Sequence, residues 1–240
     1  GGAFSLGFNL GWSVSNLVSA NWENISKRLF LPARQQDVLY DIRDNLMDVL
    51  KFLPLGDLSD LEGGLAPYYY DWLDHPEFDS YWESVSIEDS HDQVSVPVFN
   101  YGGWYDIFLR GTLNNFAGLA AKNKAGTKLM VGPWEHGVGS VQHGDVAFGP
   151  EAEVNLETER LRWFNHILKG EENGILDSPP ARLFIMGGGN NDRTESGKLD
   201  HGGVWVEASA WPPPESTGRE FYLHDDGRLA LERPSDITEP

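Results

Sequence analysis

Two residues able to do acid–base chemistry follow two short apolar runs in the middle of the chain. The run VPVFNY (96–101) leads to Asp106 in GGWYD, and the run KLMVG (128–132) leads to His136 in GPWEHG. An imidazole can take a proton from a nucleophile, while a carboxylate orients the imidazole and stabilises its cation. The pair therefore predicts the base and the acid of a nucleophilic catalytic set.

The two apolar runs have the length and composition of buried parallel strands. Between them lies a segment (107–123) whose apolar residues share one helical face. These are Leu109, Leu113, Phe116 and either Leu119 or Ala120. A crossover helix between parallel strands brings both strand ends to one edge of the sheet, where α/β enzymes place their chemistry. The spacing thus predicts an α/β fold with Asp106 and His136 at adjacent strand ends.

The sequence before the first strand predicts a helical unit, residues 1–91. Apolar residues at steps of three and four over 32–53 predict an amphipathic helix. Dense apolar residues over 3–20 predict a mostly buried helix, with a strand over its first half as the alternative. In the aromatic and acidic segment that follows, Asp71 and Asp79 are expected to be N-caps of short helices.

After His136 the pattern changes from helical to β-prone. Residues 156–170 predict a helix that ends at Gly170. Its apolar residues are expected to face inward: Leu161, Phe164, Ile167 and Leu168. Beyond Pro179 the runs are short and divided by turn residues, and Asp226-Gly227 predicts a tight hairpin. An all-β region is therefore expected to start at residue 179.

The composition restricts the partners of the protein. A net charge of −19 and a pI near 4.6 repel nucleic acid and anionic lipid, so we expect neither nucleic-acid nor membrane partners. The absence of cysteine excludes a disulfide or a thiolate nucleophile and favours a reducing compartment such as the cytoplasm. No apolar run reaches the roughly 18 residues of a membrane span. Both ends read as interior sequence, so a longer parent protein is expected.

Long motifs in the chain resemble the cocaine esterase-like (CocE/NonD) hydrolases, a family related to the X-Pro dipeptidyl-peptidases and the α-amino acid ester hydrolases. VPVFNYGGWYDIFLRGTLNNF and KLMVGPWEHG are similar to that family's acid and base segments. GGAFSLGF and WLDHPEFDSYW resemble its helical cap. FNHILKGEENGILDSPPARLFIMG, WPPP and YLHDDGRL resemble its passage into a C-terminal jelly roll. The likeness covers nearly the whole chain.

The resemblance implies a fold and a division into domains. It implies the C-terminal half of an α/β-hydrolase sheet, preceded by a helical cap and followed by the start of a β jelly roll. The expected domains are 1–91 for the cap, 92–178 for the α/β part with acid and base, and 179–240 for the jelly roll.

The resemblance also implies a serine hydrolase that cleaves ester or amide acyl bonds through an acyl-enzyme, with Asp106 as the acid and His136 as the base. The family places its nucleophilic serine on a sharp turn after an earlier strand, upstream of the cap, and a tyrosine further upstream helps to form its oxyanion hole. Ser13 and Ser140 are the nearest candidates, but neither has the preceding strand and following glycine of such a turn. We expect the nucleophile to lie outside this chain, and the chain alone to be inactive.

The residues around the pair suggest the substrate class. Trp104, Tyr105 and Trp134 either wall an acyl pocket or pack the top of the sheet. Asp106 is followed by apolar residues (107–109) where the amino acid ester hydrolases carry carboxylates that bind an ammonium group. This difference favours a neutral, hydrophobic acyl group. Glu135 is given no triad role, because neighbouring residues usually point apart.

Two other functions remain as alternatives. His136, His143 and Asp145 share a Gly-rich loop that could bind a metal, but the usual zinc motifs are absent. The β-rich end could belong to a carbohydrate-binding or assembly module without catalysis. The favoured expectation is a small-molecule ester or amide substrate, no metal and no cofactor, with homo-oligomerisation left open.

Overall fold

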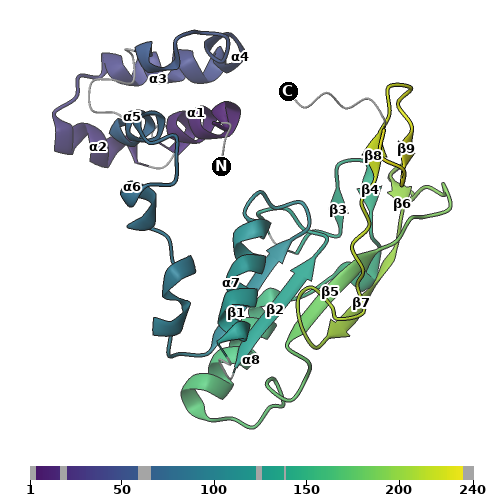
Figure 1. Ribbon diagram of the computed structural model, residues 1–240. Coiled ribbons are helices and arrows are strands. Elements are labelled where there is room, and N and C mark those ends of the chain that lie inside the picture. The colour runs from purple at the N-terminus through teal and green to yellow at the C-terminus, as the bar shows by residue number, and fades with distance from the viewer. Residues whose placement is uncertain (1–3, 17–20, 59–65, 123–125, 138, 235–240) are drawn as a thin grey trace. The chain divides into compact units, whose positions relative to one another are not determined.

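The computed structural model describes residues 4–16, 21–58, 66–122, 126–137 and 139–234. They belong to two compact units, Gly1–Ser86 and Ile87–Pro240 (Figure 1). Within the described ranges no helix combines the length and apolarity needed to cross a membrane.

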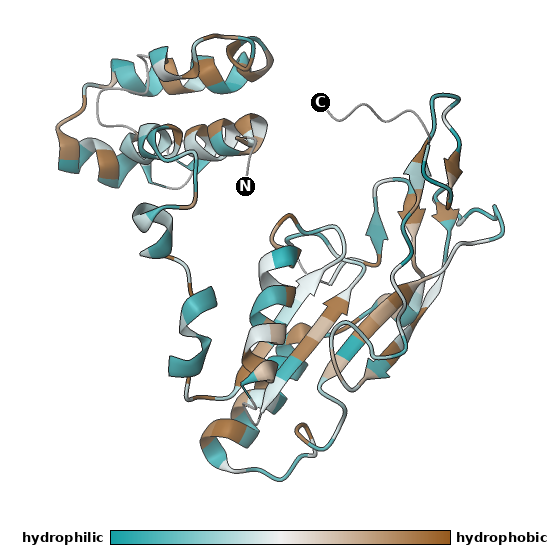
Figure 2. Ribbon diagram, viewed as in Figure 1, coloured by the Kyte–Doolittle hydropathy of each residue, from teal (hydrophilic) through white to brown (hydrophobic). Residues whose placement is uncertain are grey.

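All the regular elements described in the first unit are helical, as the sequence predicts, and each helix mixes hydrophobic and hydrophilic residues (Figure 2). The core of the unit is made by fully buried side chains of α1, α3 and α5, among them Leu10, Leu39 and Tyr69. The elements are α1 (Leu6–Ser15), α2 (Trp22–Leu29), α3 (Arg34–Asp44), α4 (Leu46–Val49), η2 (Leu55–Asp57), α5 (Pro67–Asp74) and α6 (Ser80–Glu83). Residues 17–20 of the first predicted helix lie outside the described residues.

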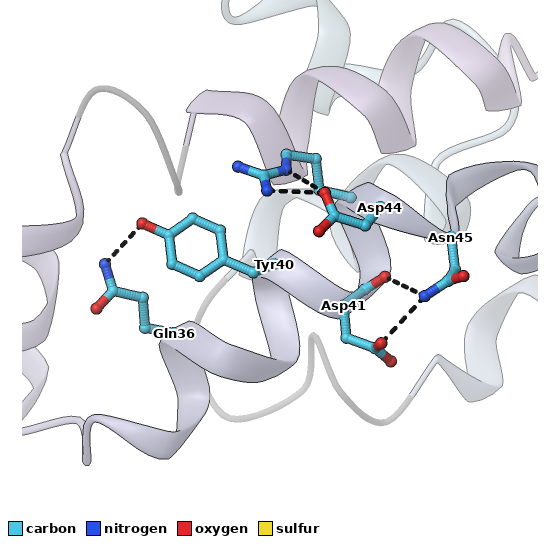
Figure 3. Close-up of polar contacts among 6 residues, drawn as sticks. Gln36, Tyr40, Asp41, Asp44 and Asn45 are labelled. Atoms are coloured by element: carbon cyan, nitrogen blue, oxygen red, sulfur yellow. Dashed lines mark hydrogen bonds and ion pairs between the residues drawn. The ribbon is translucent and has the colours of Figure 1, made fainter.

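The single helix predicted over 32–53 is interrupted at Asn45, between α3 and α4. The Asn45 side-chain amide donates to the backbone oxygen of Asp41 and to its carboxylate, both at 3.0 Å (Figure 3). The Asn45 backbone amide keeps its helical bond to the same Asp41 oxygen at 2.9 Å, but the Asn45 backbone leaves the helical range, with φ of −112° and ψ of 23°. The prediction of one continuous helix was wrong because apolar spacing does not report this local change of the backbone.

The two predicted N-caps have different outcomes. Asp79 is confirmed, since its carboxylate accepts a hydrogen bond of 3.0 Å from the Tyr81 amide at the start of α6. A second bond, from His75, holds the pKa of Asp79 below its ordinary value. The prediction that Asp71 is an N-cap was wrong, because Asp71 lies inside α5, which begins at Pro67. Proline suits the first helical position because its fixed φ is already helical.

The second unit is built on a four-stranded sheet with the order β1-β2-β5-β7 (Figure 1). The strands are β1 (Val98–Gly103), β2 (Thr127–Gly132), β5 (Ala181–Met186) and β7 (Gly203–Ala208). β1, β2 and β5 are parallel, and β7 is antiparallel to β5. Helix α7 (Leu109–Ala121) connects β1 to β2, which confirms the predicted crossover. The turn η4 (Glu88–Gln93) precedes β1.

Alternate residues of β2 face two different helices. Leu129 and Val131 share a buried cluster with Phe116 of α7. Met130 points to the other face and packs against Leu156 of α8 (Leu156–Lys169). Because side chains alternate along a strand, the two helices cover opposite faces and all six residues of β2 are buried. The predicted inward face of α7 is confirmed, with Leu119 rather than Ala120 as its last buried member.

The predicted inward face of α8 was wrong. Leu161, Phe164 and Leu168 are 61%, 53% and 75% exposed, whereas Leu156 and Trp163 are buried. The Trp163 ring lies 5.4 Å from that of Phe99 on β1. The helix carries two apolar stripes, and the stripe with the large indole faces the sheet because it buries more area there.

Both ends of α8 are capped, and the sequence predicted the C-terminal cap. Gly170 is the left-handed C-cap with φ of 71°, as predicted. At the other end the Asn155 side chain accepts a hydrogen bond of 3.0 Å from the Thr158 amide.

Replacing Asn155 with Ala is expected to lower the free energy of unfolding by about 1 kcal/mol, because the Thr158 amide loses its acceptor. Urea unfolding followed by circular dichroism measures this change. Asn155→Asp retains the acceptor and should remain close to the parent chain. An equal loss in both variants would contradict the capping role.

The β-prone runs after residue 179 do not start a separate sheet. β5 extends the parallel sheet from β2, and β7 pairs with β5 along its whole length. Strands on both sides of residue 178 therefore form one sheet, and the expected division into domains stays a prediction. The hairpin prediction is confirmed: β8 (Tyr222–Leu223) and β9 (Leu229–Ala230) flank Gly227, whose φ is 78°.

Three short strands form a second small sheet in this unit. They are β3 (Gln142–His143), β4 (Val146–Ala147) and β6 (Leu199–Asp200), in that order. The turn η5 (Pro150–Ala152) follows β4. The expected jelly roll stays a prediction.

Candidate active site

Asp106 and His136 meet beyond the carboxyl ends of β1 and β2. The His136 Nδ1 atom lies 3.1 Å from the Asp106 Oδ2 atom. The other carboxylate oxygen, Oδ1, accepts a hydrogen bond of 2.8 Å from the Phe108 amide. The Asp106 side chain is 10% exposed and that of His136 is 74% exposed. The predicted proximity of the two residues is confirmed.

The contact with Asp106 determines which nitrogen of the His136 imidazole carries the proton. An ionised carboxylate only accepts hydrogen bonds, so His136 donates from Nδ1 when it pairs with Asp106. A neutral imidazole with its proton on Nδ1 has a lone pair on Nε2. The Nε2 atom of the exposed ring can therefore accept a proton from a hydroxyl group. The Phe108 amide holds the Asp106 carboxylate in place through its bond to Oδ1.

The turns that carry the two residues are joined by their backbones. The amide of Trp104 donates to the Gly132 oxygen at 2.9 Å, and the amide of Tyr105 donates to the Trp134 oxygen at 3.0 Å. A Cβ atom on Gly103 would lie 1.9 Å from that same Trp134 oxygen. Glycine at this position therefore permits the close approach that aligns the turns.

The three residues predicted to line an acyl pocket occupy different surroundings. Trp134 is fully buried against Met130, with its indole N–H unpaired among the described residues. Trp104 is partly buried and donates to the Phe184 oxygen at 2.7 Å. Tyr105 is 38% exposed. Their role in binding an acyl group stays a prediction.

Phe108 is a site residue that sequence reasoning missed. Its amide orients Asp106, and its ring lies 5.0 Å from the His136 ring in an edge-on arrangement. The side chain is 49% exposed. An Asp side chain commonly accepts a hydrogen bond from the amide two residues later. The spacing of two residues between Asp106 and Phe108 could therefore have predicted this bond.

The two serines considered as nucleophiles are hydrogen-bonded to backbone oxygens. Ser13 is buried within α1 and donates to Asn9 at 2.8 Å. Ser140 lies in a loop and donates to Gln142 at 2.6 Å. Both are the ordinary helix and loop serines that the sequence predicts.

The metal alternative finds no support in the described ranges. They contain no group of three or more His, Cys, Asp or Glu side chains able to hold a metal ion. The His143 Nδ1 atom instead lies 3.5 Å from the Glu135 carboxylate.

A cavity of about 260 Å³ lies at the opposite ends of the strands and includes neither Asp106 nor His136 in its lining. Lys128, near the start of β2, lines it together with Arg162 and Glu207. The Lys128 ammonium donates to the Ser178 and Pro179 oxygens, and burial lowers its pKa. We interpret Lys128 as a support for the loop that leads into β5.

Comparisons with known proteins agree with the resemblance in the sequence. A model of the X-Pro dipeptidyl-peptidase (S15) family matches residues 1–138, a stretch that includes both Asp106 and His136. The cocaine esterase of Rhodococcus sp. (strain MB1 Bresler) is 29% identical over 239 residues, which cover 95% of this chain and 37% of the esterase. The chain therefore spans little more than a third of that relative's length.

A crystal structure of a CocE/NonD family hydrolase from Staphylococcus aureus is also similar. It matches with a TM-score of 0.48 and 20% identity, over 69% of this chain and 26% of the hydrolase. The predicted kinship with the cocaine esterase-like hydrolases is confirmed, and the chain belongs to the X-Pro dipeptidyl-peptidase (S15) family.

Proposed function

We propose that the chain is part of a serine hydrolase that cleaves ester or amide acyl bonds through an acyl-enzyme. The observation that carries the proposal is the contact of 3.1 Å between His136 Nδ1 and Asp106 Oδ2. In this role His136 removes the proton of a serine hydroxyl through Nε2 and returns it to the leaving group, while Asp106 stabilises the imidazolium. Membership of a hydrolase family supports the same reaction class.

The nucleophilic serine in this proposal comes from outside the 240 residues. Ser13 and Ser140 are engaged with backbone oxygens, and neither follows a strand on a sharp turn. An oxyanion hole is needed as well, since base and acid alone stabilise no tetrahedral intermediate. Both parts are assigned to the longer parent protein.

The proposed substrate carries a neutral, hydrophobic acyl group. Ile107 and Phe108 follow the acid and are 64% and 49% exposed. The Phe108 ring lies beside His136, so an acyl chain bound near the base would meet an apolar surface. The absence of a carboxylate at these positions argues against a substrate ammonium group.

The chain alone is expected to hydrolyse p-nitrophenyl acetate no faster than the same concentration of free imidazole. An activated base without a nucleophile and an oxyanion hole has little to act on. Release of p-nitrophenol at 400 nm measures the rate, with His224→Ala as a control for histidines elsewhere in the second unit. Turnover far above this background that His136→Ala abolishes would place the whole active site within these residues.

A further inference from the structure

His143 contacts the neighbours of both members of the catalytic pair. Its Nδ1 atom lies 3.5 Å from the carboxylate of Glu135, the residue before His136. Its ring centroid lies 4.0 Å from that of Tyr105, the residue before Asp106, with the planes tilted by 32°. One side chain thus spans the Asp106 turn (residues 104–108) and the His136 turn (residues 133–137).

The hairpin that carries His143 is anchored largely outside these turns, although its Phe148 ring also lies 6.1 Å from the Tyr105 ring. His143 on β3 pairs with Val146 on β4, and β4 in turn pairs with β6. The amide of Phe148, just after β4, donates to the Val141 oxygen at 2.9 Å. The Phe148 ring is 1% exposed and packs against Phe184 of the main sheet. Because the hairpin is fixed by these contacts, His143 can hold the turns that carry Tyr105 and Glu135 in place.

His136 needs support from outside its own contacts. Its side chain is 74% exposed, and in the described residues it meets the Asp106 carboxylate and the Phe108 ring. An exposed imidazole loses rotational freedom when it is held in one orientation, and few packing contacts offset that loss. The orientation of the ring therefore depends on how firmly the two turns are held against each other.

We propose that His143 is a positioning residue that ties the Asp106 turn to the His136 turn. Stacking on Tyr105 holds the first turn, and the pairing with Glu135 holds the second. The pair with Glu135 is ionic only when His143 is protonated, and an exposed ion pair contributes little, so the ring contact with Tyr105 is the stronger of the two. The catalytic consequence rests on the proposed function, whereas the effect on the Asp106–His136 hydrogen bond does not.

The tautomer of His136 reports this effect directly. When Asp106 accepts from Nδ1, the neutral ring carries its proton there; a ring released from Asp106 reverts towards the Nε2–H form that free histidine prefers. Long-range ¹H–¹⁵N correlation spectra of the ¹⁵N-labelled chain at about pH 8.5, where an ordinary imidazole is neutral, distinguish the two forms. The His136 signals are assigned by their loss in His136→Gln.

His143→Ala is expected to shift His136 from mainly Nδ1–H to mainly Nε2–H. His143→Phe keeps the stacking on Tyr105 without the pairing, so it should retain most of the Nδ1–H form. His224→Ala removes a histidine from the β8–β9 hairpin and should leave the His136 signals unchanged. If His143→Ala fails to fold, Tyr105→Leu removes the ring contact from the other side, and the same shift towards Nε2–H is expected. An unchanged tautomer in folded Tyr105→Leu would overturn the proposal.

An unchanged His136 tautomer in folded His143→Ala would overturn the proposal, as would an equal shift in His224→Ala. A parent protein that shows no hydrolase activity, combined with the expected tautomer shift, would refute the proposed function and leave the positioning role of His143 intact.

Discussion

Replacing Asp106 with Asn in the proposed serine hydrolase is expected to lower kcat by about 10⁴-fold. The Phe108 amide donates to Oδ1, so the asparagine oxygen takes that place and its NH₂ group turns to His136. An NH₂ group donates, which requires His136 Nδ1 to accept and moves the ring proton to Nε2. The base would then have no lone pair to offer a serine.

Two measurements check this expectation. Steady-state kinetics on p-nitrophenyl acetate give kcat and KM, and KM should change little because Asp106 is 10% exposed and lies behind the imidazole. Asp225→Asn, an exposed substitution near the β8–β9 hairpin, makes the same chemical change elsewhere and should leave kcat unaltered. A loss of less than about 10-fold in Asp106→Asn would be incompatible with the role of the acid.

Replacing Gly103 with Ala is expected to destabilise the second unit by about 3 kcal/mol or more, the upper part of the range for overpacking. The new Cβ atom would lie 1.9 Å from the Trp134 oxygen. Because the obstacle is backbone, a change of rotamer cannot relieve the clash. The turns must separate, which also weakens the Tyr105 amide bond to that oxygen.

Gly111→Ala is the matched control. No atom lies within 4 Å of a Cβ atom at Gly111, which belongs to α7. The same change there should stabilise the helix by up to about 1 kcal/mol. Urea unfolding followed by tryptophan fluorescence compares the two variants, and coincident midpoints would show that the close approach at Gly103 is not required.

The part of the fold that brings Asp106 and His136 together could be predicted from local patterns in the sequence. Two short apolar runs and an amphipathic segment between them predicted β1, α7 and β2, and all three are present. Parallel strands joined by a crossover helix end at the same edge, so the proximity of Asp106 and His136 followed from chain order. Their catalytic roles rest on family resemblance and stay a proposal.

Predictions failed where two local patterns competed. In α8 both apolar stripes had helical spacing, and burial of Trp163 against Phe99 selected one of them. At Asn45 the backbone leaves the helical range, which no hydrophobic period reports. The runs that form β5 and β7 read equally well as the start of a new sheet or as the extension of an old one. Strand pairing is non-local, so the sequence of one strand does not name its partner.

The sequence by itself determined which residues could act as acid and base, and which edge of the sheet would carry them. Only the tertiary structure decided that Phe108 orients Asp106, that Trp134 enters the core, and that His143 lies between the two turns. Periodicity records which face of an element is buried. Contacts between loops depend on how the backbones of separate elements approach each other, and Gly103 shows that this approach is set to within the size of one methyl group.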